Sequence, residues 1–167
     1  LPTCNDDIRL PLVLDLAEVH LHLGQDQAAE SLVQNELKLH PEHPELRALL
    51  VRIVIIQGDW YAAGEAVEAM YETIERDGVT EQNWAWLHTM QAQSHIKNHL
   101  AFPDSIQREF LVAIAPLPRE QRTKHREAIL RLLQSESVLA FEALEWAKAM
   151  RDEIPRNAYD EYTVASL

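Results

Sequence analysis

The sequence predicts an all-α protein built as a stack of antiparallel helical hairpins, with about seven or eight helices. The first supporting observation is an internal sequence repeat, which we call the echo. Gly24-Gln25-Asp26-Gln27-Ala28-Ala29 returns as Gly58-Asp59-Trp60-Tyr61-Ala62-Ala63, at an offset of 58 − 24 = 34. A fixed period of this size is typical of stacked helical hairpins. The second is that apolar residues recur at helical spacings, and the third is that prolines and glycines fall where such helices would begin and end.

The first hairpin is predicted over residues 10–43. Its first helix runs from Leu10 to Leu23, tolerates Pro11 in its opening turn and stops at Gly24. The apolar residues at helical spacing are Leu12, Leu16, Val19 and Leu23. A second helix carries Ala29 and Val33 and ends before Pro41.

The second hairpin is predicted over residues 44–77. Pro44 and Glu45 open its first helix, because proline suits the first helical turn and an acidic residue complements the helix dipole there. The run from Leu49 to Ile56 is rich in β-branched residues and is also compatible with a buried strand. The register of the echo favours the helix, since a strand would have no counterpart in the first copy. The next helix spans Trp60 to Arg76.

The second half of the chain is also predicted to be helical, but it does not keep the repeat period of the first half. Thr80-Glu81-Gln82-Asn83 opens a helix that runs to about Leu100, and Ile106 to Ala115 form a shorter one. Together they give a degenerate hairpin over residues 80–115. Pro116-Leu117-Pro118 marks a bend. A C-terminal hairpin is predicted over residues 118–153, with helices from about Arg119 to Leu133 and Ser137 to Arg151, followed by a tail at 154–167.

Composition bounds the chain's organisation and partners. Its 167 residues are enough for one domain, so residues 1–167 are expected to form a single helical-repeat domain. The formal charge of −12 disfavours nucleic acid and anionic membranes as partners. The acidity is concentrated in residues 1–116, with 18 acidic against 7 basic residues. Cys4 is the only cysteine, which excludes an internal disulfide, and we expect a cytoplasmic location.

Catalytic and cofactor motifs are missing from the sequence. It contains no G-x-G-x-x-G, no G-x-x-x-x-G-K-[ST] and no G-x-S-x-G, the signatures of dinucleotide binding, of phosphate loops and of nucleophile elbows. Many acidic pairs arise by chance among 27 carboxylates and do not identify a general acid and base. We therefore expect no enzyme and no cofactor.

Three histidines give the sharpest metal-binding alternative. His88, His95 and His99 fall on one side of a helix, and the last two have the i,i+4 spacing that chelates zinc. The glutamate of H-E-x-x-H is absent. The other interpretation is a polar stripe whose histidines meet solvent or hydrogen-bond partners.

A basic cluster is predicted on the helix after the Pro-Leu-Pro bend. Its members are Arg119, Arg122, Lys124 and Arg126, with Arg131 further along. The cluster is a candidate patch for an acidic partner, and the alternatives are a solvated face or a nucleic-acid contact. Few aromatic residues lie nearby to stack on bases.

The echo resembles the tetratricopeptide repeat, a helix-turn-helix unit of the same period. Its small and apolar signature positions fall on Leu16, Ala17, Gly24, Ala29 and Val33, and again on Leu50, Val51, Gly58, Ala63 and Val67. Two departures are Glu75 in place of a proline and Glu36 in place of a small residue. The resemblance implies a right-handed stack of antiparallel helical hairpins, a tetratricopeptide-like α-solenoid.

The resemblance also implies a concave groove that binds partner peptides. Carried onto this sequence, its positions are Pro11, Leu14, Glu18, Leu21, His22, Glu45, Ala48, Arg52, Ile55 and Ile56. The alternative for Leu21, Ile55 and Ile56 is packed core. Chaperone-binding members hold a peptide carboxylate with lysines, an arginine and asparagines, whereas these positions offer only Arg52, so a receptor for chaperone tails is disfavoured.

The expected function is a non-catalytic scaffold or adaptor that binds a protein or peptide, alone or as part of a larger protein or complex. A second hypothesis comes from Asp15-Leu16-Ala17-Glu18 and His40-Pro41-Glu42-His43-Pro44, which resemble the repeat-bearing regulatory domains of bacterial transcription activators. A third hypothesis is a metal-dependent enzyme at the histidine stripe.

Overall fold

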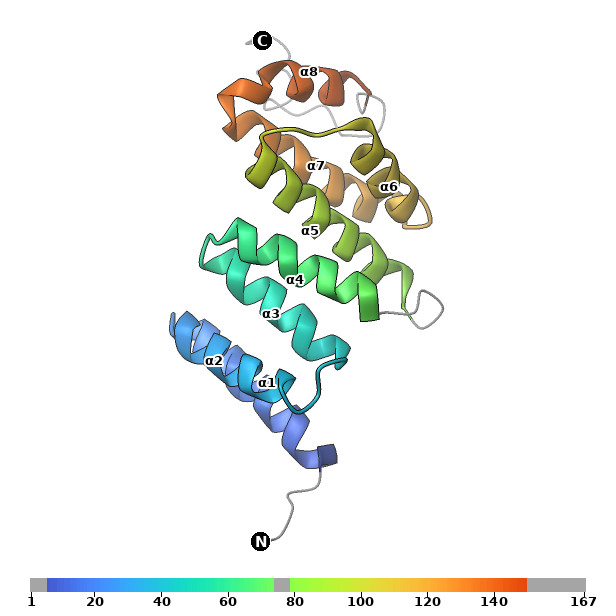
Figure 1. Ribbon diagram of the computed structural model, residues 1–167. Helices are drawn as coiled ribbons and strands as arrows, with labels where there is room; N and C mark the ends of the chain where they lie inside the picture. Colours follow the sequence, from blue (N-terminus) through green and yellow to red (C-terminus); the bar gives the residue numbers. More distant parts are fainter. Residues whose placement is uncertain (1–5, 74–78, 150–167) are drawn as a thin grey trace, which may run out of the picture. The chain divides into compact units, whose positions relative to one another are not determined.

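All regular secondary structure that the structure describes is helical. The computed structural model describes residues 6–73 and 79–149, which form eight α-helices and one short 3-10 helix (Figure 1). This confirms the predicted all-α class. The contacts divide the chain into two compact units, Leu1–Glu75 and Arg76–Leu167, which are described separately below. One continuous domain over residues 1–167 stays a prediction.

The first unit consists of two consecutive helical hairpins. Its helices are α1 (Asp6–His22), α2 (Asp26–Leu37), α3 (Pro44–Ile56) and α4 (Trp60–Thr73). Each helix packs against the next, and α1 also contacts α3. The run Leu49–Ile56 lies within α3, so the helix prediction is confirmed and the strand alternative is wrong. Because α1 contacts α3, the first helices of the two hairpins are neighbours.

Two glycines set the turns at equivalent places in the hairpins. Gly24 and Gly58 have φ angles of +68° and +78°, in the left-handed region that side chains with a Cβ atom rarely adopt. Their amides donate to the carbonyls of Leu21 and Ile55, each at 3.0 Å. The same backbone bond thus recurs after one repeat period, and the positive φ at each turn accounts for the repeated glycine.

Two helix starts in the first unit illustrate what the sequence indicates. Pro44 lies at the beginning of α3 as expected, and Nδ1 of His43 accepts from the Leu46 amide at 3.4 Å. The predicted start of α1 at Leu10 is wrong, because the helix already begins at Asp6 and contains Pro11 in its interior.

The core of the first unit lies between the two hairpins. Small and branched side chains from α1, α2 and α3 form one buried cluster, which consists of Ala17, Ala29, Val33, Leu46, Leu49 and Ile53. In α4, Ala63 and Val67 are buried at positions equivalent to Ala29 and Val33. The repeat period therefore extends from the turns to the packing.

The second unit has a different contact pattern. Its helices are α5 (Glu81–His99), α6 (Asp104–Ile114), α7 (Arg119–Ser135) and α8 (Ala140–Ala149), with a 3-10 turn at Ser137–Leu139. Helix α5 packs against both α6 and α7, and α7 packs against α8. In the first unit, by contrast, each helix packs mainly on its neighbours in sequence. This difference accompanies the loss of the repeat register.

Aromatic packing organises the core of the second unit. The Trp146 ring on α8 contacts Phe102 and Phe110, with ring centroids 5.0 and 5.8 Å apart. Ile129, Leu130 and Leu133 from α7 belong to the same buried cluster. At the start of α5, Thr80 Oγ1 accepts from the Asn83 amide at 3.2 Å, which confirms the predicted N-cap.

Three predicted segments lie outside the described residues. They are the tail at 154–167, the end of the second repeat at 74–77 and the last part of the C-terminal hairpin at 150–153.

Candidate functional site

The predicted groove residues centre on an ion pair between α1 and α3. Arg52 donates from Nη1 to Glu18 Oε1 and from Nη2 to Glu18 Oε2, the second contact at 3.3 Å. The two side chains remain 48% and 34% exposed. Glu18 and Arg52 are one repeat period apart, so equivalent positions of successive hairpins meet. The resulting surface feature is a bidentate, partly solvated pair of opposite charges.

The other groove positions divide between core and surface. Leu14 and Leu21 pack against the buried cluster of the first unit, as the core alternative predicted for Leu21. Ala48 and Ile55 are half-buried. Ile56 is 56% exposed, so the core alternative is wrong for this residue. Three further groove positions are exposed, namely Pro11, His22 and Glu45.

Helix geometry explains this division. Leu14 and Leu21 lie seven residues apart on α1, so both point to the same side as Ala17, which is fully buried. Ile56 is the last residue of α3, where the chain turns away from the hairpin interface. A partner on the predicted groove would therefore meet Glu18, Arg52 and Ile56 first.

Glu36 is a buried acidic residue at a position where the repeat family has a small one. Its carboxylate is 4% exposed and accepts from Arg9 Nη2 at 2.8 Å through Oε2. Oε1 lies 3.6 Å from His40 Nε2. The pair ties α1 to α2 across 27 residues of sequence. Arg9 was not identified as its partner from the sequence, because no local spacing relates the two residues.

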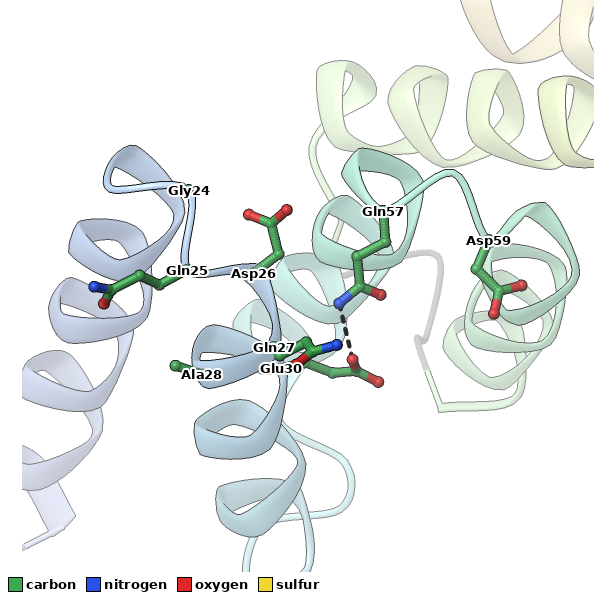
Figure 2. Close-up of a pocket in the computed structure, with 8 residues that line it drawn as sticks. All are labelled: Gly24, Gln25, Asp26, Gln27, Ala28, Glu30, Gln57 and Asp59. Atoms are coloured by element: carbon green, nitrogen blue, oxygen red, sulfur yellow. Dashed lines mark hydrogen bonds between the residues drawn. The ribbon is translucent and has the colours of Figure 1, made fainter.

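An open surface pocket of about 810 Å³ lies between the turns of the two hairpins (Figure 2). On its wall, Gln57 Nε2 donates to Glu30 Oε2 at 2.9 Å. Asp26 and Asp59 also line it, which makes the pocket polar and acidic. The lining residues are Gly24, Gln25, Asp26, Gln27, Ala28, Glu30, Gln57 and Asp59. The sequence analysis did not identify this pocket, although the echo could have indicated it by placing two turns one repeat apart.

The histidine stripe does not form a three-ligand site. The His88 side chain is buried and packs edge-on against Trp84, with centroids 4.7 Å apart. His95 and His99 pack on each other at 4.5 Å, and His95 Nδ1 lies 3.3 Å from the Ala101 carbonyl oxygen. Within residues 6–73 and 79–149, no three histidine, cysteine or carboxylate side chains are placed to share a metal ion. This corrects the three-histidine alternative.

A different histidine, the half-buried His125 on α7, contacts α5 in the second unit. The Thr89 hydroxyl donates to the Ala85 carbonyl at 2.7 Å and lies 2.8 Å from His125 Nδ1. Because the hydroxyl proton is engaged, Nδ1 acts as the donor to Thr89 Oγ1. Burial lowers the pKa of His125 below its ordinary value of 6.5. The pair joins α5 to α7, which makes it a structural contact.

The basic cluster on α7 is only partly available to a partner. The Arg122 guanidinium donates to the Leu117 carbonyl at 2.7 Å, just beyond the end of α6. Lys124 pairs with Glu120 at 2.9 Å, and its hydrogen bond and charge lower the pKa of that carboxyl. Arg119 and Lys124 are exposed, whereas Arg126 is half-buried. The acidic-partner patch at these residues stays a prediction.

Comparisons with protein-family models, curated proteins and solved structures find no match to the chain. Within the described ranges, no helix has the length and apolar character to cross a bilayer.

Proposed function

We propose that the chain is a non-catalytic protein-interaction module, and that it binds a peptide or helix of its partner on the α1–α3 face. The observation that carries this proposal is the pairing of Glu18 with Arg52. One repeat period separates these residues, yet their charged groups meet on a partly exposed surface. Repeated hairpins leave an extended surface of this kind, on which a partner can dock with little ordering of the receptor.

The chemistry of the face defines the expected ligand. Ile56 offers exposed apolar area at one edge, while Glu18 and Arg52 offer an acceptor and a donor at the centre. A segment with an apolar anchor next to a polar or charged side chain satisfies both features. The resemblance to the tetratricopeptide repeat supports the same assignment. A regulatory domain of a transcription activator would use the same face and stays an alternative.

The test is affinity capture from the native host with wild type and two groove variants. Arg52→Glu places two carboxylates together, and Ile56→Asp introduces charge at an exposed apolar position without opening the core. Val112→Asp is the matched control, since Val112 is 67% exposed on α6 of the second unit. Circular dichroism must first show that every variant is folded. We expect both groove variants to lose partners that the control retains, and retention by both groove variants overturns the proposal.

A further inference from the structure

Helix α1 is apolar on two sides. One side faces the first-unit core, where Ala17 is fully buried and Val13, Leu14 and Leu21 pack around it. The other side carries a row of exposed apolar residues that we call the α1 stripe. It comprises Ile8, Leu12, Leu16, Val19 and, directly after the helix, Leu23, which are 59%, 59%, 48%, 52% and 66% exposed. A helix that is apolar all round is normally covered on both sides.

The repeat register shows what kind of surface the α1 stripe is. Moving one repeat period along the chain from Leu12, Leu16 and Val19 leads to Leu46, Leu50 and Ile53 on α3. Leu46 and Ile53 are fully buried in the first-unit core, and Leu50 packs against it. These α3 residues are the ones that dock α3 onto the α1–α2 hairpin. The α1 stripe therefore repeats a docking surface, and no hairpin among the described residues 6–73 covers it.

Charge indicates which kind of chain complements this surface. Residues 1–75 contain 14 acidic and 4 basic residues, a formal charge of −10. A second copy would bring an equal negative charge to the contact, which opposes association. Asp15 is exposed on the same helix, within one turn of Leu12 and Leu16. Basic residues around an apolar contact would complement this charge.

We propose that the α1 stripe docks a helical hairpin from a different protein, which presents small and apolar side chains in its centre and basic residues at its rim. This surface is separate from the groove around Glu18 and Arg52, so the proposal goes beyond the proposed function. The partner hairpin would pack on the α1 stripe in the same way that the α1–α2 hairpin packs on the equivalent face of α3.

A peptide derived from the chain itself can serve as the probe. Residues 6–40 span α1 and α2, whose packing face already accepts α3. Lysine at three stripe positions removes the peptide's own stripe, and lysine at two acidic positions of α2 makes the rim basic. Glu30 lies at this rim, since it contacts Gln57 at the end of α3. The formal charge of the peptide rises from −5 to +2. The substitutions are L12K, L16K, V19K, D26K and E30K.

Binding of this peptide to the full chain is measured by fluorescence anisotropy, and hydrogen exchange maps the protected amides. We expect protection of α1, and at least tenfold weaker binding to a Leu12→Gln/Leu16→Gln variant, because two half-exposed leucines lose their apolar contact. Val112→Gln, at an exposed apolar site on α6, should change the affinity less than twofold. A peptide that keeps Asp26 and Glu30 should bind more weakly than the basic one.

Two further measurements test the remaining alternatives, namely a free peptide that does not fold and binding of a second copy of the chain. If the free peptide is not helical by circular dichroism, the same peptide is joined ahead of residue 6 by a flexible linker, which raises its effective concentration. Absence of α1 protection in both the free and the tethered form overturns the proposal. Sedimentation velocity tests the second copy, and a dimer that Leu12→Gln/Leu16→Gln abolishes would also overturn it.

Discussion

Removing Arg9 should destabilise the first unit because it leaves the carboxylate of Glu36 buried beside only His40. The Arg9–Glu36 contact is a 2.8 Å charge-assisted hydrogen bond to a side chain that is 4% exposed. Such a bond contributes about 1.5–3 kcal/mol. Arg9 itself is 40% exposed, so solvent screening reduces the expected loss to about 1–2 kcal/mol for Arg9→Met.

A double-mutant cycle isolates this contribution. Glu36→Leu replaces the buried carboxylate by an apolar side chain, and Arg9 can then turn to solvent, so we expect a change of less than about 1 kcal/mol. In that background Arg9→Met should cost less than about 0.5 kcal/mol, which gives a coupling energy of about 0.5–2 kcal/mol. The assay is urea unfolding followed by far-UV circular dichroism. An equal cost of Arg9→Met in both backgrounds would refute the reasoning.

Three other perturbations test separate parts of the fold by the same unfolding assay. Gly24→Ala and Gly58→Ala should each cost about 1 kcal/mol, because alanine is strained at positive φ, whereas asparagine at either position should cost less; equal costs for the two substitutions would contradict this. In the folded state the pKa of His125 lies below 6.5. As the pH falls, the unfolded state therefore binds a proton at this histidine at a higher pH than the folded state does. Stability should therefore be retained above about pH 6.5 and fall below it, and a pH dependence unchanged in His125→Gln would exclude this cause. Arg122→Ala should cost about 1 kcal/mol through the lost bond to Leu117, while Arg122→Lys should recover part of it.

The sequence predicted best what depends on short-range signals. Proline and glycine mark several helix ends, although Pro11 lies inside α1, and the period places Gly24 and Gly58 in equivalent turns. The same period favoured a helix over a strand at Leu49–Ile56, although the β-branched residues there are also compatible with a strand, and the structure confirms the helix. These features need only residue spacing and backbone preferences, and both can be read along the chain.

Long-range contacts were harder to predict from the sequence. The partner of Glu36 lies 27 residues earlier on another helix, so no spacing rule connects them. Helix α1 has apolar residues on two sides, and its sequence does not say which side the next hairpin covers. The α5-centred packing of the second unit likewise depends on contacts between helices rather than on a repeat. Of the groove, the sequence indicated the helices but not the division between half-buried Leu21 and exposed Ile56.

The proposed recognition face can be tested directly by reversing its central ion pair. In the Glu18→Arg/Arg52→Glu variant the two charges exchange places, so the pair can still form and the free energy of unfolding should stay within about 0.5 kcal/mol of wild type. A partner that recognises the positions of these two charges would find the negative and the positive charge exchanged. We therefore predict that the affinity for a partner captured by the wild type falls at least tenfold in this stable variant. Unchanged affinity would contradict the assignment of the α1–α3 face as the binding surface.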